Sequence, residues 1–224
     1  DHRLLLCDSL QKKDRFETFP AFSPDGRTLY FCSAEAKKIP EEYKEIRYNL
    51  CSIDFDPSAG TFGSRIDTLV NAEALGKSVS FPRPSYDGKY IMFTLSDYGN
   101  FSIWHKEADL WLLDLTSGDL RKLSEVNSDD TESFHNWSSN SRWFVFSSRR
   151  GDGLYTRLYL ASMDENGKIS KPFLLPQEDP ETYYDRSVYS YNVPDFTSEP
   201  IKIDTRVFEK KITSKERIQV QAKK

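Results

Sequence analysis

The residues best suited to chemistry gather in two polar stretches, 96–106 and 126–133. The first stretch is rich in aromatic side chains and ends beside a carboxylate, and the second is rich in Asp and Glu. Imidazole and carboxylate groups together can bind a metal ion or exchange protons, whereas exposed aromatics among mixed charges are typical of binding surfaces. The candidate residues in and around these stretches are Tyr98, Trp104, His105, Glu107, Asp129, Asp130, Glu132, His135, Arg149 and Arg150.

The spacing of these residues favours binding over catalysis. His105, Glu107, Asp109 and His135 do not follow the His-Glu-x-x-His pattern, which places two histidines on one helix face. We therefore predict neither a metal site nor a cofactor. Neighbouring arginines are usually solvated, and an anion clamp is the alternative for Arg149-Arg150.

Three copies of one hairpin position these stretches. The first copy begins Phe-Pro-Ala-Phe-Ser-Pro-Asp-Gly at residue 19, and the others begin at Phe81 and Phe134. Each copy is followed by an alternating apolar strand, a polar turn and a further short apolar strand. Four strands repeated three times are typical of β-propeller blades.

The turn of each hairpin is expected to need a left-handed residue. Gly26 and Gly88 supply it in the first two copies, because glycine carries no steric penalty there. The third copy has Ser139-Asn140-Ser141 instead, and we expect Asn140 to take the left-handed position.

These repeats resemble the WD40-like (PD40) repeats of TolB-like six-bladed β-propellers, over residues 16–176. The resemblance implies an all-β propeller with three four-stranded blades and partial strands at both ends. Such a chain is either an open arc or part of a larger ring, which has six blades in the family that the repeats resemble. It also implies a periplasmic or cell-envelope scaffold of a Gram-negative bacterium that contacts protein partners.

The repeats divide the chain into consecutive units. The expected units are 1–15 (a strand of a preceding blade and a connector), the blades 16–75, 76–125 and 126–176, closing strands within 177–208, and a basic tail, 209–224, whose composition is typical of a disordered end. We expect single strands at 3–7, 189–196 and 201–207. Three blades cannot close a ring, so we expect missing N-terminal blades or another chain to complete it.

In a propeller, the loops between the second and third strands share one face with the loops that lead into the next blade. This rule places 96–106 beside 126–133, and we expect a protein or glycan partner at that face. Trp111, Trp137 and Trp143 lie in strand patterns and are predicted to pack in the core.

Composition limits the remaining alternatives. Cys7, Cys32 and Cys51 are predicted to be buried thiols, with a Cys32–Cys51 bridge left open. The net charge of −4 combines a tail, 202–224, of about +5 with an acidic remainder. An acidic body without a basic stripe argues against nucleic-acid binding. No apolar run is long enough to predict a transmembrane segment.

Two classes of function remain. The first, a non-catalytic binding scaffold, is favoured, although whether the protein is an enzyme stays open. The second is the propeller domain of a prolyl-oligopeptidase-like hydrolase, whose catalytic domain would lie outside this chain because no Gly-x-Ser-x-Gly motif is present. A lyase or glycosidase acting through His105 or His135 is a weaker alternative.

Overall fold

The computed structural model describes residues 4–217, in which three four-stranded antiparallel sheets follow one another along the chain. The first sheet contains β1 (Arg15–Phe22), β2 (Thr28–Glu35), β3 (Asn49–Asp56) and β4 (Thr61–Val70). The second contains β5 (Ser78–Pro84), β6 (Tyr90–Ser96), β7 (Asp109–Asp114) and β8 (Leu120–Lys122). The third contains β9 (Glu132–Trp137), β10 (Trp143–Ser148), β11 (Arg157–Ser162) and β12 (Phe173–Leu174).

Short helices lie before the first sheet, within the first two sheets' connections, between sheets and after the last sheet. They are the 3₁₀ turns η1 (Asp8–Leu10), η2 (Tyr43–Glu45), η3 (Glu73–Leu75) and η4 (Ser102–Trp104), and the α-helices α1 (Pro180–Arg186) and α2 (Thr205–Thr213). None of the helices in the described part of the chain is long and apolar enough to cross a membrane.

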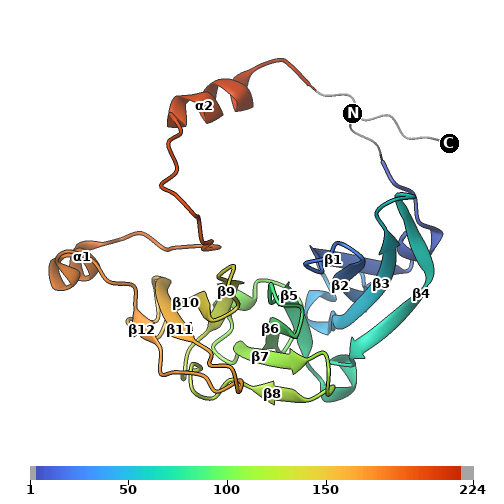
Figure 1. Ribbon diagram of the computed structural model, residues 1–224, viewed down its shortest axis with the longest axis horizontal. Coiled ribbons are helices and arrows are strands. Elements are labelled where there is room, and N and C mark those ends of the chain that lie inside the picture. The colour runs from blue at the N-terminus through green and yellow to red at the C-terminus, as the bar shows by residue number, and fades with distance from the viewer. Residues whose placement is uncertain (1–3, 218–224) are drawn as a thin grey trace.

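The three sheets stand side by side in an open arc, with β1, β5 and β9 on its inner side (Figure 1). Each sheet is a meander in which consecutive strands pair, as in a propeller blade. The predicted fold class, three four-stranded propeller blades, is therefore confirmed.

Alternating side chains of β6 hold the blades together. Ile91, Phe93 and Leu95 are buried against the first sheet. Met92 points the other way and packs against the third sheet with Trp137. Because successive strand residues face opposite sides, one strand contributes to two cores, and each fully buried side chain stabilises the fold by about 1.5–3 kcal/mol.

Each inner strand carries a bulge at the first phenylalanine of the repeat. Phe19, Phe81 and Phe134 have φ of 52°, 53° and 49°, in the left-handed region that phenylalanine rarely adopts. The pairing register of each inner strand shifts at this residue. The ring centroids of Phe19 and Phe81 lie 4.3 Å apart, and those of Phe81 and Phe134 lie 4.8 Å apart. The bulges therefore join the three blades through one row of rings.

The third hairpin turn differs from the sequence prediction. Ser141, with φ of 56°, takes the left-handed position, and the prediction of Asn140 is wrong. Ser141 stands where the first two copies have Gly26 and Gly88. The side-chain oxygen of Asn140 instead accepts hydrogen bonds from the Ser138 hydroxyl at 2.7 Å and the Arg142 amide at 3.0 Å.

The single strands predicted near the two ends are absent. Residues 4–7 form no strand, and residue 3 lies outside the described part of the chain. Residues 189–196 and 201–204 are irregular, whereas 205–207 and 209–213 lie in α2. Residues 218–224 of the predicted tail lie outside the described part of the chain. Helix-capping residues explain the helices, since the carboxylates of Asp179 and Asp204 accept backbone hydrogen bonds at the starts of α1 and α2.

Irregular segments, rather than further strands, cover the first and third blades. Cys7 and Leu10 pack on the outer face of the first sheet, against a buried cluster that includes Phe31 and Ile53. On the third sheet, Ser147 donates a hydrogen bond of 2.7 Å to the carbonyl of Asn192. We call residues 4–10 the N-terminal cap and residues 187–194 the C-terminal cap. Both reduce the apolar surface that the ends of an arc would expose.

The sheets show whether the predicted cysteine bridge forms and whether the predicted core tryptophans are buried. Cys32 and Cys51 are both free thiols, and they lie on opposite faces of the first sheet because Cys51 pairs with Phe31. Burial raises the pKa of both thiols.

Trp137 is buried and Trp111 packs at the edge of a core, but Trp143 is exposed, so its predicted core position is wrong.

The left-handed backbone at Phe81 predicts an unusual order of substitutions. Phe81→Gly should be at least as stable as Phe81→Ala, because alanine at positive φ costs about 1–2 kcal/mol. At Tyr90, a β6 residue without positive φ, Tyr90→Gly should be about 0.5–1 kcal/mol less stable than Tyr90→Ala. Urea unfolding of the four variants measures both differences. A glycine variant less stable than the alanine variant at both positions contradicts the strained bulge.

Candidate functional site

The loop after β6 is fixed by contacts with the first blade. The amide of Gly99 donates to the carbonyl of Ile46 at 2.9 Å, and the side-chain amide of Asn100 donates to the carbonyl of Tyr43 at 3.1 Å. A Cβ atom at Gly99 would lie 2.4 Å from two ring carbons of Tyr48, so a glycine is required at this close approach. The insertions of the first two blades are thereby interlocked.

This loop presents two large aromatic side chains to solvent. Phe101 is 78% exposed and Trp104 is 66% exposed. Phe101 also has φ of 54°, and no burial of its side chain compensates for this strained backbone. Strained residues without a packing role are often found at functional sites.

The loop after β10 places Arg149 against Trp104. The guanidinium carbon of Arg149 lies 4.4 Å from the centre of the Trp104 ring, within the range of a cation–π interaction. Its Nη2 atom donates a hydrogen bond of 2.6 Å to the carbonyl of Gly153. Arg149 is only 9% exposed, and its Nε atom is buried without a hydrogen-bond partner.

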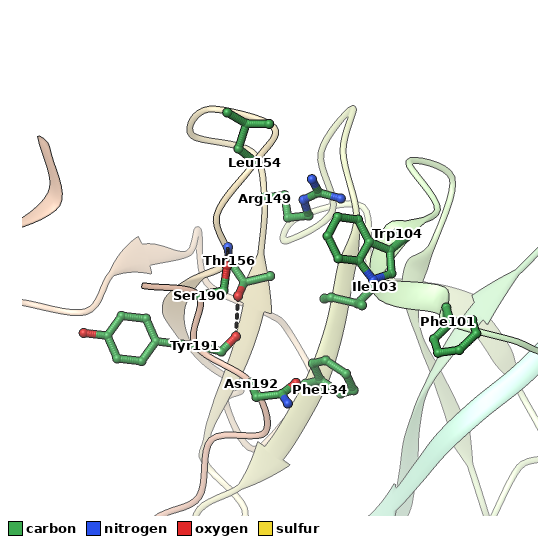
Figure 2. A pocket seen from close by; sticks show the side chains of 10 residues that line it. All are labelled: Phe101, Ile103, Trp104, Phe134, Arg149, Leu154, Thr156, Ser190, Tyr191 and Asn192. Atoms are coloured by element: carbon green, nitrogen blue, oxygen red, sulfur yellow. Dashed lines mark hydrogen bonds between the residues drawn. The ribbon is translucent and has the colours of Figure 1, made fainter. Parts of the chain in front are cut away.

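A pocket of about 360 Å³ opens between these two loops and the C-terminal cap. Tyr191 forms the third wall through its backbone, with its amide donating 3.1 Å to the carbonyl of Thr156 and its carbonyl accepting from the Thr156 hydroxyl. Figure 2 shows the Tyr191 ring turned away from the pocket and Arg149 at its upper end beside Trp104. The pocket is lined by Phe101, Ile103, Trp104, Phe134, Arg149, Leu154, Thr156, Ser190, Tyr191 and Asn192.

Only two of the ten predicted site residues, Trp104 and Arg149, line this pocket. The wall formed by 190–192 was not predicted, because the pattern of 189–196 indicates a single strand. Phe134 was not predicted either, because it begins a repeat whose residues indicate the fold alone. The left-handed backbone of Phe101 left no signal in the sequence.

Besides Arg149, three predicted residues are buried, which contradicts their expected display on one face. His135 is 1% exposed, with Nε2 positioned 2.9 Å from the carbonyl of Met92. Burial lowers the pKa of His135 to about 3. His105 is buried as well, with its ring 4.1 Å from the ring of Tyr98 and Nδ1 3.4 Å from a carboxylate oxygen of Glu107.

Glu132, the third of these, links the loop before β9 to the end of β10. Its side chain is fully buried and accepts hydrogen bonds from the Ser128 hydroxyl at 2.6 Å and the Ser148 hydroxyl at 2.7 Å. Nη2 of Arg150 approaches the same carboxylate at 2.9 Å. Burial raises the pKa of Glu132, and these contacts oppose the rise. Arg150 also stacks on Tyr159, so the predicted solvated pair Arg149-Arg150 is in fact two differently buried arginines.

The remaining candidates are distributed around the loops. Tyr98 is half-buried beside Tyr43, and Glu107 and Asp129 are exposed. Asp130 is half-buried, and its carboxylate accepts a hydrogen bond of 2.8 Å from the amide of Thr131. Within residues 4–217, no group of three or more His, Cys, Asp or Glu side chains is arranged to hold a metal ion.

Comparisons with known proteins find similarity at the level of structure. No family model matches the sequence, and no curated protein matches it significantly. TolB from Acinetobacter baumannii is similar at 18% identity and a TM-score of 0.41, with 70% of this chain and 32% of that chain covered. The β-propeller domain of the Trilobed protease from Pyrococcus furiosus is similar at 17% identity and a TM-score of 0.42, with 74% and 44% covered.

A puromycin-hydrolyzing peptidase from Mycobacterium tuberculosis is also similar, at 15% identity and a TM-score of 0.49, with 73% of this chain and 24% of that chain covered. This chain therefore spans less than half of the length of each of the three. TolB, whose family the repeats resemble, is thus among the solved structures that are similar to this chain. The assignment of the three sheets as propeller blades rests on their topology.

The burial of His135 predicts a pH dependence of stability. Its folded pKa, about 3, lies below the ordinary value of 6.5, so the unfolded chain binds a proton that the folded chain does not. The contribution of His135 is therefore complete above about pH 6.5 and is lost as the pH falls towards 3, by up to about 1.4 kcal/mol per pH unit.

Urea unfolding of the wild type and His135→Gln at pH 7, 6 and 5 isolates this effect. The wild type should lose stability more steeply than His135→Gln over this range. Parallel losses in the two proteins contradict the assigned burial of a neutral imidazole.

Proposed function

We propose that this chain is a non-catalytic binding scaffold, and that the pocket beside Trp104 receives an apolar segment of a protein partner. The observation that carries this proposal is the group of exposed side chains at the pocket, where Leu154 is 65% exposed and stands with Phe101 and Trp104. Large apolar side chains that remain exposed around a hollow are typical of interaction sites.

The lining of the pocket supports a protein segment over a glycan. Ile103, Phe134 and Leu154 offer apolar surface, and few side-chain hydroxyls face the space to meet those of a sugar. The pocket lies near the lower end of the range of small-ligand sites, roughly 300–1,000 Å³, so it suits one or two side chains of a partner.

The buried histidine gives no support to a catalytic alternative. His135 is enclosed by the blades, so a substrate cannot reach its ring, and its pKa of about 3 leaves it neutral near pH 7. A lyase or glycosidase acting through this residue is therefore not proposed.

We infer a cell-envelope location for the scaffold from the resemblance of its repeats to TolB-like propellers. The free Cys32 and Cys51 are compatible with this location, because they lie on opposite faces of a sheet and cannot pair. Other blades, from the same or another chain, would complete the ring around the inner side of the arc.

Trp104→Ala should weaken binding of the partner by about thirty-fold, because an aromatic anchor in an interface contributes about 2 kcal/mol or more. Tyr86→Ala is the matched control, since Tyr86 is an exposed aromatic at the opposite end of β6. A partner would first be captured from an envelope extract by cross-linking and then purified, and its affinity for each variant measured by titration calorimetry. Equal affinities for Trp104→Ala and Tyr86→Ala contradict the proposed site.

A further inference from the structure

Three arginines are buried or half-buried around the third blade, and only two of them face a carboxylate. Arg150 lies 2.9 Å from Glu132, and Arg157 lies 3.7 Å from Asp152. Arg149 has no carboxylate within ion-pair distance among residues 4–217, although it is nine-tenths buried. A buried cation without an anion is costly, because the loss of its hydration is not repaid.

The acidic side chain nearest in sequence is already engaged. One carboxylate oxygen of Asp152 accepts hydrogen bonds of 2.8 Å from the amides of both Leu154 and Tyr155. Its other oxygen faces Arg157. Asp152 is thus oriented by its own loop and by Arg157, and it attracts Arg149 only from beyond ion-pair distance.

The contacts of Arg149 leave part of its hydrogen-bonding capacity unused. Nη2 donates to the carbonyl of Gly153, and the ring of Trp104 attracts the guanidinium. Nε remains buried with no acceptor, whereas almost all buried N–H groups in proteins are paired. Arg149 also lines the pocket, so an anion held there would lie beside a guanidinium that has no carboxylate within ion-pair distance.

The pocket below Arg149 is apolar. Figure 2 shows the guanidinium in the upper part of the pocket, below Leu154 and beside Trp104, with Ile103 and Phe134 further down. A group that fits this arrangement carries a negative charge at one end and an apolar body behind it. The planar guanidinium matches a carboxylate better than it matches any other common anion except phosphate.

We propose that the pocket binds a carboxylate carried by an apolar group, with the carboxylate at Arg149 and the apolar group against Ile103 and Phe134. In a protein partner, this combination occurs at a chain terminus that ends in a large apolar residue. The inference rests on the proposed binding function and adds the chemistry that the pocket recognises. Trp104 contributes to the binding of both the carboxylate and the apolar group, because it holds the Arg149 guanidinium and forms a wall of the pocket.

Two pairs of probes test this inference. The first pair is N-acetyl-Gly-Gly-Phe as its free acid and as its C-terminal amide. The second pair is 3-phenylpropionate and 3-phenylpropionamide. Each pair keeps the apolar group constant and removes only the charge, so the ratio of affinities within a pair reports on the carboxylate alone. Titration calorimetry and tryptophan fluorescence measure binding to the purified full chain.

The wild type should bind at least one acid about tenfold or more tightly than its amide, because hydrogen bonds between charged groups are the strong ones. Arg149→Met should abolish this preference, and Arg149→Lys should retain part of it. Arg142→Met, which removes an exposed arginine away from the pocket, should behave as the wild type. Thermal unfolding of each variant confirms that it is folded.

The remaining outcomes are equally decisive. Equal binding of acid and amide, an acid preference that survives in Arg149→Met, or no binding of either pair at millimolar concentration overturns the carboxylate site. Any of these results leaves the proposed scaffold function intact if Trp104→Ala still weakens binding of the protein partner. A preference for the peptide acid over phenylpropionate supports a chain terminus as the source, and equal affinity supports a small apolar acid instead.

Discussion

The left-handed phenylalanine at the bulge of each inner strand is the constraint on which the rest of the structure depends. At Phe19, Phe81 and Phe134, the backbone adopts a conformation that costs about 1–2 kcal/mol per residue. The bulge turns each ring towards the next blade, and contacts between aromatic rings contribute about 0.5–1.5 kcal/mol per pair beyond the burial of their area. The row of rings joins the inner edges of the blades, and its last member, Phe134, lines the pocket.

The pocket exists because two neighbouring blades and one irregular segment meet at that ring. The second blade contributes Trp104 and the third contributes Arg149, whose guanidinium is held against the indole. The C-terminal cap adds the backbone of Tyr191 as a wall, anchored on Thr156. The apolar interior therefore comes from the fold itself, and the charged end comes from a loop that leaves one arginine without a carboxylate.

The repeats allowed the blades to be predicted from the sequence, because the hairpins that begin at Phe19, Phe81 and Phe134 are each followed by two further strand patterns. The site was predicted only in part. Trp104 and Arg149 were identified as loop residues of suitable type, but Glu132 and His135 were placed on the surface although they are buried. Burial of polar residues depends on partners distant in sequence, such as Met92 for His135 and Arg150 for Glu132. The C-terminal cap was missed because its alternating aromatic residues follow a strand pattern although it forms no ladder.

The pocket depends on the C-terminal cap, which lies on the third blade and forms the third wall. Hydrogen exchange of backbone amides tests this placement, since the amide of Tyr191 is bonded to Thr156 in the folded chain. This amide should exchange markedly more slowly than those of residues 197–203, an exposed segment that follows the cap. Exchange of Tyr191 as fast as that of residues 197–203 would show that the cap is detached and that the pocket lacks its third wall.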